Sequence, residues 1–214
     1  MGRRHRNKRR AKSIPDALGR AETKLAQANL LLGDLQNATG KSMTAGNSGA
    51  LEAYFSACLG LAKSAYYLML HTGAPFQNAQ REWLKGIGGS EAAFFARMKG
   101  LRDDDVHFAN TSTKRLTKYE DEDEWRRRSP FRDADSVYYH SRLIHNAALF
   151  GPRPVIEQTN PDGTVVRGAT LRGTVGLYIE ERGQLIEATT ACSRFITQLR
   201  SLLEAVRAHQ ITMR

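Results

Sequence analysis

Apolar residues recur at helical spacing along three long stretches of the chain. In the first stretch the steps between them alternate between three and four residues, which places the side chains in a narrow seam on one helix face. The seam residues are Leu18, Ala21, Leu25, Ala28, Leu32 and Leu35. The pattern predicts a helix over about residues 15–40, with Pro15 in its first turn and Gly40 near its end.

Two further helices carry broader apolar stripes. The first is predicted over about residues 49–71, where Gly73 and Pro75 would stop it, and it is expected to be the central core helix. Its stripe contains Leu51, Tyr54, Phe55, Cys58, Leu59, Ala62, Tyr66 and Met69. The second is predicted over about residues 186–208, packed against the first helix of the chain, and its stripe contains Ala188, Cys192, Phe195, Leu199, Leu202 and Val206.

A helical segment over about residues 78–99 contains an interruption at residues 86–89. Three of those four residues are glycine, which costs too much helix propensity to leave the helix unbroken, so we expect a hinge with Ser90 capping the restart. Gly100 is predicted to end this helix as a C-terminal cap. A short helix would then begin at residues 103–105, continue through Asn110 and fade before Lys118.

Beyond Pro152 the pattern changes to that of strands and hairpins. Residues 160–163, Asn-Pro-Asp-Gly, and Arg182-Gly183 are turn sequences between short runs of β-forming residues. The predicted fold class is therefore mainly α: a helical bundle with a small antiparallel β-hairpin appendage, at about residues 152–184, before the C-terminal helix. We expect a single helical domain over residues 13–214, with a charged linker at residues 119–132.

Basic residues are concentrated at the N-terminus. The chain carries a net charge of +10, and residues 1–12 hold seven Lys or Arg and no acid, so the remainder carries 10 − 7 = +3. The segment is predicted to be a disordered arm that binds RNA backbones without sequence preference; a solubilising tail is the alternative. Its basic residues are Arg3, Arg4, Arg6, Lys8, Arg9, Arg10 and Lys12.

Cys58 and Cys192 each fall within a predicted apolar stripe, without a neighbouring Cys or His at metal-ligand spacing. They are interpreted as reduced core residues, with a disulfide between them as the alternative. No apolar run reaches the length that spans a bilayer, and the basic N-terminus precedes no signal-peptide core. We therefore expect a cytoplasmic protein without membrane association.

The strongest candidate chemistry lies in the sequence Arg102-Asp103-Asp104-Asp105-Val106-His107. Arg grips phosphate through a planar fork of donors, and His exchanges a proton near neutral pH. With a helix break at Gly100, Arg102 would lie at a corner and His107 in the next helix, so that the two side chains converge. The segment resembles the motif of the HEPN superfamily of helical-bundle proteins, in which Arg is followed by a polar residue and then, four to six residues after the Arg, by His.

The resemblance covers about residues 14–119 and the last helix. It implies a metal-independent endoribonuclease without a cofactor, which forms a 2′,3′-cyclic phosphate. His107 would act as general base or acid, Arg102 would hold the phosphate, and Asp103 would orient one of them. It also implies RNA as the substrate and a homodimer as the active unit, and it leaves open a role as a toxin or defence effector with an antitoxin-like protein partner.

Two other functions remain open from the residues. The three aspartates 103–105 disfavour RNA beside the motif, and in a non-catalytic interaction module they would form salt bridges with Arg102 while His107 packs. Alternatively, nucleic-acid binding would reside in the basic arm alone. His140 and His145 are the next candidates for proton transfer, and Tyr67 is a candidate for stacking on a base.

Overall fold

The computed structural model describes residues 2–39, 50–107, 113–120, 156–168 and 172–212. Within these ranges it describes the backbone but not the side chains of residues 2–15, 102–107, 120, 156, 168, 172, 173, 211 and 212. Residues 121–150 lie outside the described ranges. They include residues 121–132 of the predicted charged linker and the candidate proton carriers His140 and His145.

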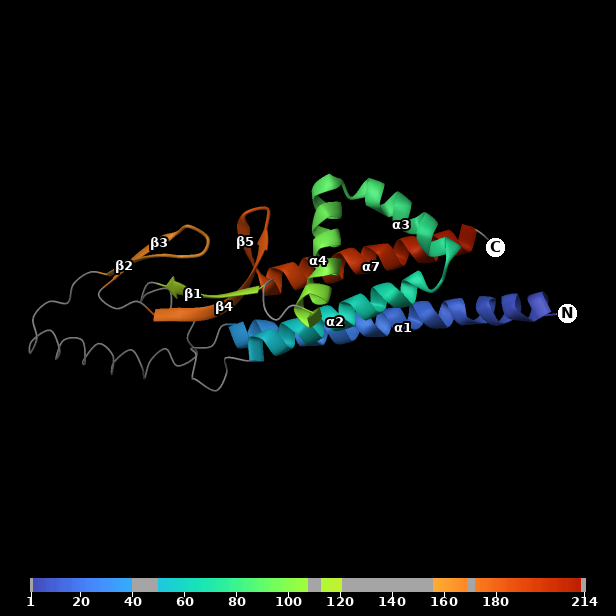
Figure 1. Ribbon diagram of the computed structural model, residues 1–214, viewed down its shortest axis with the longest axis horizontal. Coiled ribbons are helices and arrows are strands. Elements are labelled where there is room, and N and C mark those ends of the chain that lie inside the picture. Colours follow the sequence, from blue (N-terminus) through green and yellow to red (C-terminus); the bar gives the residue numbers. More distant parts are fainter. Residues whose placement is uncertain (1, 40–49, 108–112, 121–155, 169–171, 213–214) are drawn as a thin grey trace, which may run out of the picture.

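Three long helices run side by side and form the bundle (Figure 1). They are α1 (Gly2–Thr39), α2 (Ala50–Leu70) and α7 (Ala188–Thr212). Helix α7 packs against both α1 and α2, as predicted for the last helix and the first. Two shorter helices complete the described helical part: α3 (Ala74–Gly86), which packs along α7, and α4 (Gly89–His107), which crosses the bundle (Figure 1).

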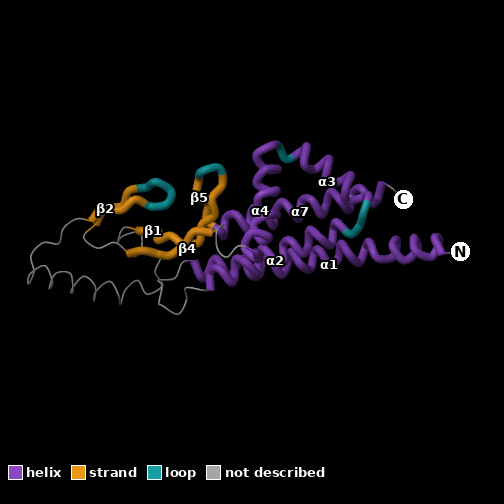
Figure 2. The backbone as a smooth tube through the Cα atoms, in the orientation of Figure 1, coloured by secondary structure: helices purple, strands orange, loops and turns teal. Residues whose placement is uncertain are grey.

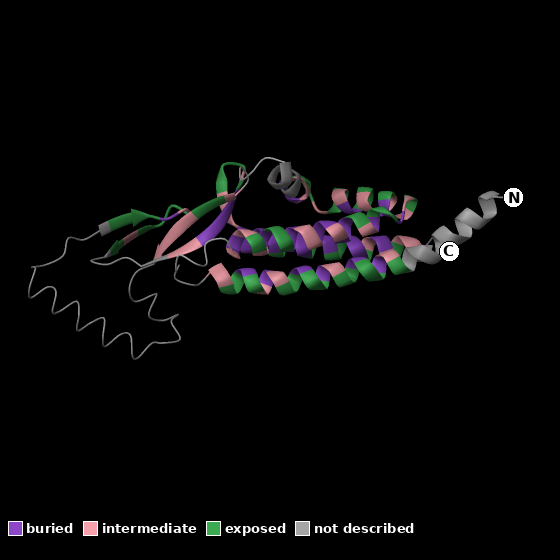
Figure 3. Ribbon diagram, turned by 60° about the horizontal axis from the view of Figure 1, so that its bottom comes forward, coloured by how far each residue is buried: buried purple, intermediate pink, exposed green. Residues whose placement is uncertain are grey.

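The predicted seams form the core. All six seam residues of α1 are buried, as are all six stripe residues of α7. In α2 the stripe is buried except for Tyr54, which is partly exposed. Figure 3 shows the result as buried stripes on the facing sides of the helices and exposed stripes on their outer sides. Because burial of each apolar side chain stabilises the fold by about 1.5–3 kcal/mol, these faces dominate the packing.

The start of α1 differs from the prediction. The helix begins at Gly2, so residues 2–12 continue it, where a disordered arm was predicted, and Pro15 lies inside the helix instead of in its first turn. Arg, Lys and Ala are good helix formers, and a helix that is already nucleated in the core propagates at little cost. The predicted boundary at residue 12 is therefore not a boundary of secondary structure.

The predicted break between α3 and α4 is confirmed at Ile87-Gly88. Gly88 has φ +82°, a left-handed conformation that glycine adopts readily and other residues do not. Gly73, with φ +79°, is the N-cap of α3, and Pro75 lies in the first turn of that helix. A second predicted break, at Gly100, is wrong, because α4 runs continuously through it to His107.

The strands lie beyond the end of the bundle where α1 ends and α7 begins (Figures 1 and 2). Strands β1 (Thr113–Glu120), β4 (Arg172–Glu181) and β5 (Gln184–Glu187) form an antiparallel sheet in the order β1-β4-β5. Strands β2 (Ile156–Thr159) and β3 (Val165–Gly168) form a separate hairpin. The mainly α fold with a small antiparallel β element before the last helix is thus confirmed.

Strand β1 was not predicted, because the sequence pattern indicated a helix that fades over these residues. Its pairing with β4 places Thr113, Arg115 and Thr117 opposite Ile179, Leu177 and Val175. Leu177 and Ile179 are buried in the helical core, so β1 forms because a remote strand offers it a partner. Local propensity alone does not contain that information.

Asn160 fastens the hairpin to β1. Its side chain accepts a hydrogen bond from the backbone N–H of Tyr119 at 2.7 Å and donates one to the carbonyl oxygen of Tyr119 at 2.9 Å. The residue is only 5% exposed, and the pair of bonds imitates the pairing of a neighbouring strand. The β2–β3 hairpin is therefore docked onto the end of β1.

Candidate functional site at the end of helix α4

Helix α4 is anchored to the core by its apolar face. Its buried residues are Phe94, Phe95, Met98 and Leu101. The ring of Phe95 lies edge-on to Trp83, with centroids 5.1 Å apart, and its centroid is 5.5 Å from that of Phe195. Leu101 immediately precedes Arg102, so the packed part of the helix extends up to the first residue of the motif.

A polar network fixes the beginning of α4. Arg194 of α7 donates to the carboxylate of Glu91 through Nε at 3.1 Å and Nη2 at 2.6 Å, while Gln198 donates to the same carboxylate at 2.8 Å. Arg194 also pairs with Glu181 at 3.4 Å and stacks 3.9 Å from the centroid of the Phe94 ring. The hydrogen bonds from Arg194 lower the pKa of Glu91, and those to Glu91 raise the pKa of Arg194.

The motif residues occupy the last turns of α4, and their side chains lie outside the described part of the chain. Because the helix is continuous, the backbone decides which positions share a face. Asp103 and His107 are four residues apart and lie on one face. Arg102 and His107 are five apart and are turned by about 140° from each other. The structure therefore brings together the positions of Asp103 and His107, but not those of Arg102 and His107.

Helix α2 carries a buried lysine that was not among the candidate residues predicted from the sequence. Lys63 is 1% exposed, and a lysine is rarely buried so fully unless its ammonium group is paired. The signal was available in the sequence, since Lys63 follows Leu59 by four residues and precedes Tyr66 by three, within the apolar stripe. The sequence contains no such signal for the network of Glu91, Arg194 and Gln198, because these residues meet only in the folded chain.

Aromatic residues of α2 lie beside the same helix. Tyr66 is buried and packs edge-on against Phe76 and Phe95, with centroids 5.4 and 5.9 Å away. The ammonium group of Lys99 lies 5.3 Å from the centroid of the Tyr66 ring. Tyr67, the residue after Tyr66, is 44% exposed. The centroids of the Tyr66 and Tyr67 rings are 5.7 Å apart. Lys99 of α4 therefore lies beside the buried ring of Tyr66, and the exposed ring of Tyr67 adjoins Tyr66.

The two cysteines are buried and free, as predicted for reduced core residues. The thiol of Cys58 donates to the carbonyl oxygen of Ala28 at 3.3 Å. A hydrogen bond between the two thiols lowers the pKa of Cys58 and, together with burial, raises the pKa of Cys192. Their positions on the facing sides of α2 and α7 make them part of the packing between these helices.

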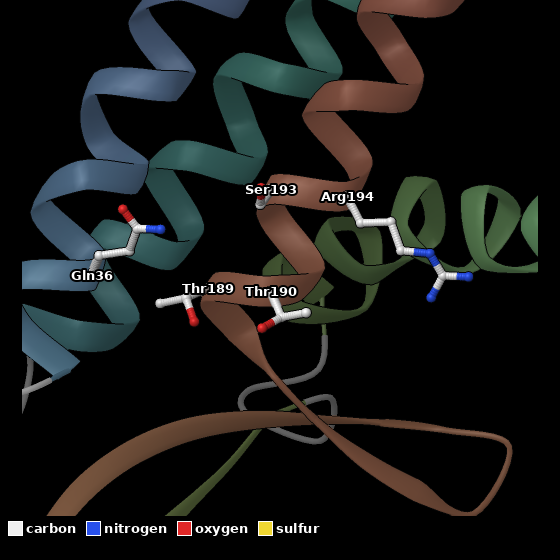
Figure 4. Close-up of a pocket in the computed structure, with 5 residues that line it drawn as sticks. All are labelled: Gln36, Thr189, Thr190, Ser193 and Arg194. Atoms are coloured by element: carbon white, nitrogen blue, oxygen red, sulfur yellow. The ribbon is translucent and has the colours of Figure 1, made fainter.

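A cavity of about 350 Å³ lies at the start of α7 (Figure 4). Gln36, Thr189, Thr190, Ser193 and Arg194 line it. Arg194 extends away from the other four side chains (Figure 4), toward its partner Glu91. The hydroxyl and amide groups that remain offer neither a proton carrier nor an unpaired cation, so this cavity is a weaker candidate than the end of α4.

None of the helices in the described ranges is long and apolar enough to cross a bilayer. Among the same residues, no three His, Cys, Asp or Glu side chains gather into a group that could hold a metal ion. No family model matches the chain, and no curated protein or solved structure matches it either. A function must therefore be argued from the residues themselves.

Proposed function

We propose that this chain is a cytoplasmic, metal-independent endoribonuclease of the HEPN type. The observation that carries the proposal is the sequence Arg102-Asp103-x-x-x-His107 in the last turns of a helix whose preceding turns are locked into the core. A rigid element holds functional groups more precisely than a loop does. The motif combines a fixed cation for phosphate with a proton carrier, the minimum for cleaving a phosphodiester with the ribose 2′-OH as nucleophile.

In the proposed reaction the 2′ oxygen attacks the adjacent phosphorus. The bond from O2′ to phosphorus forms and the bond from phosphorus to O5′ breaks, which leaves a 2′,3′-cyclic phosphate and a 5′-OH end. His107 takes the proton of the 2′-OH or supplies the proton to O5′. Arg102 neutralises the charge that builds up on the phosphoryl oxygens.

The helical positions support a division of roles. Asp103 shares a helix face with His107, which suits a carboxylate that orients an imidazole through a hydrogen bond. Arg102 lies on a different face, so we propose a homodimer in which each protomer brings its Arg102 and His107 to a shared cleft. In such a cleft the Arg102 that binds the phosphate and the His107 that carries the proton need not lie on one face of one helix.

The basic residues 3–12 are assigned to RNA binding within the same proposal. The first turns of α1 lie at the end of the bundle opposite the sheet, whereas α4 ends closer to the sheet (Figure 1). The cluster is therefore separate from the motif in one protomer. It would add affinity for the RNA backbone without taking part in the chemical step. An antitoxin-like protein partner would act by covering either region.

A non-catalytic interaction module is the second candidate, and the continuity of α4 favours it. Because Arg102 and His107 are turned by about 140° from each other, they do not lie side by side within one protomer. The aspartates 103–105 are available to form salt bridges on the helix surface. This reading requires no activity from the motif and predicts no cleavage of RNA under any conditions.

The deciding experiment is incubation of the purified protein with total RNA in the presence of EDTA. We expect cleavage, with cyclic phosphate ends, and a loss of about 10² to 10⁴ in rate for His107→Ala with RNA binding nearly unchanged. Arg102→Lys keeps the charge but loses the bidentate fork, so it should also lose most of the rate. His209→Ala and Arg81→Lys are matched controls, since His209 pairs with Glu82 on the surface and Arg81 is exposed on α3.

The outcomes separate the three readings. Cleavage that persists undiminished in His107→Ala, or that EDTA abolishes, contradicts the proposal. Absence of cleavage in every condition supports the interaction module. Deletion of residues 2–12 adds a further distinction: weaker binding with retained cleavage agrees with the enzyme, whereas loss of all nucleic-acid binding together with absence of cleavage indicates that the basic segment alone carries the function.

A further inference from the structure

Tyr67 is one of four large hydrophobic side chains that the described residues leave exposed, and the one with an aromatic ring. It is 44% exposed, although it lies on the central helix of the bundle. An exposed leucine or valine is common on protein surfaces, but an exposed tyrosine ring offers a flat apolar face and a polar end. Such a ring can stack on a nucleic-acid base of any sequence.

The ring is held by a rigid support. Its neighbour Tyr66 contacts it at 5.7 Å between centroids, in a T-shaped arrangement. Tyr66 is itself 6% exposed and packed edge-on against Phe76 and Phe95. Because a tyrosine has only two side-chain torsions to fix, a supported ring on a helix binds a base at low cost in conformational entropy.

A cation lies next to the two tyrosines. Residues 60–79 of the chain contain no Asp or Glu, and the one lysine among them, Lys63, is buried. The ammonium group of Lys99, on α4, lies 5.3 Å from the centroid of the Tyr66 ring. An exposed aromatic ring with a cation beside its neighbour suits a single-stranded nucleic acid, whose bases stack while its phosphates pair.

Lys99 connects this surface to the proposed catalytic residues. It precedes Arg102 by three residues on a continuous helix, so both positions lie on the same side of α4. A strand whose scissile phosphate is held by Arg102 would therefore run past Lys99 toward Tyr66 and Tyr67. The successive contacts would be Arg102 with the reacting phosphate, Lys99 with a neighbouring phosphate and Tyr67 with a base.

We propose that Tyr67 is a substrate-positioning residue, which stacks on a base of single-stranded RNA next to the cleaved phosphate while Lys99 pairs with the phosphate between them. This inference rests on the proposed ribonuclease function and names the class of its substrate. A double-stranded RNA keeps its bases stacked on one another and gives Tyr67 nothing to bind. The site is therefore selective for single strands.

The test uses a fluorescein-labelled RNA decamer of randomised sequence. Binding is measured by fluorescence anisotropy in the His107→Ala background, where cleavage does not consume the probe, and cleavage is measured with His107 present. Tyr67→Ala should weaken binding roughly 5- to 100-fold, the range for loss of one stacked base, and should raise KM much more than it lowers kcat. Tyr67→Phe and Tyr67→Trp should retain binding, because both keep an aromatic face.

Two further variants sharpen the result. Leu70→Ala removes an exposed apolar side chain, 39% exposed, one helical turn away, and should leave binding unchanged. Lys99→Gln should reduce the slope of log K against log salt by about 0.7, the value for one phosphate contact on a single strand. A duplex formed from a decamer of defined sequence and its complement should bind Tyr67→Ala and the parent protein equally.

The results distinguish failure of this inference from failure of the proposed function. If the protein cleaves the decamer but Tyr67→Ala binds and cleaves as the parent does, the stacking role is wrong and the ribonuclease stands. If Leu70→Ala weakens binding as much as Tyr67→Ala, the surface is a general apolar contact and the inference also fails. If no RNA is bound or cleaved by any form, both proposals fail together.

Discussion

Arg194 is bound on two sides by acids from remote parts of the chain. It pairs with Glu91 of α4 and Glu181 of β4, and Gln198 donates a third hydrogen bond to the Glu91 carboxylate. Glu91 and Arg194 are 103 residues apart in sequence, so no local pattern could predict the network. It is the polar connection that holds the start of α4 against α7.

The network predicts a dependence of stability on pH. The pKa of Glu91 is lowered in the folded chain, first by the hydrogen bond from Arg194, so its contribution is fully present above the unfolded pKa of about 4.3. It is lost as the pH falls through the lower, folded pKa. Glu91→Gln should therefore destabilise the protein near neutral pH, by at most about 1 kcal/mol because the pair is about one-third exposed.

Urea unfolding of Glu91→Gln and the parent chain at several pH values between 3 and 7 measures this effect. The difference between the two midpoints should shrink as the pH is lowered through 4. Glu180→Gln is the matched control, since Glu180 pairs with Lys114 on the open surface and its removal should change little. A constant difference over the whole range would mean that the ion pair does not contribute.

At the scale of the elements, the helices were predictable where one face is buried along its whole length. The apolar faces of α1, α2 and α7 each lie within one continuous segment of sequence. The residues predicted from their helical spacing to face the core are nearly the same residues that are buried in the structure. Strand β1 was not predictable, because the residues that stabilise it belong to β4, more than 50 positions later. Of the candidate site, the motif was visible in the sequence, and so was the position of Lys63 within an apolar stripe, whereas Arg194 gains its role only through contacts between elements.

Gly100 provides a direct test of the continuity of α4. In the interior of a helix, glycine is less favourable than alanine by roughly 0.5–1 kcal/mol, and an added methyl group at Gly100 meets nothing within 4 Å. Gly100→Ala should therefore stabilise the protein by about that amount. At a left-handed helix cap the same substitution would cost about 1–2 kcal/mol instead.

Gly88→Ala is the matched control for that substitution. Gly88 also has open space around it, but its φ is +82°, so alanine should destabilise the protein by about 1–2 kcal/mol. Both variants are compared with the parent chain by urea unfolding. A Gly100→Ala variant that loses stability as Gly88→Ala does would show that α4 ends before the motif, as the sequence suggested, and would restore the corner at Arg102.

At the scale of the whole molecule, α2 is the element that connects the parts. It packs against α1 and α7 and contacts α4 and β4, and it carries Cys58, Lys63 and Tyr67 within about three turns of helix. Any opening of the bundle that exposes one of its buried faces must separate α2 from α1 or α7. The accessibility of Cys58 and Cys192 therefore reports on the integrity of the core as a unit.

Thiol labelling measures that integrity. Cys58 and Cys192 are 0% and 1% exposed, so a thiol reagent can reach them only after the helices part. If this opening is global and costs about 5 kcal/mol or more, native labelling should be slower than labelling in denaturant by a factor of at least about 4 × 10³. Both thiols should then react at the same rate. Labelling of the Cys58→Ala and Cys192→Ala variants, each of which retains one thiol, shows which rate belongs to which cysteine. Rapid labelling of either thiol in the native protein would contradict the assignment of both helix faces to one core. Two different slow rates would show that α2 and α7 separate from the bundle independently.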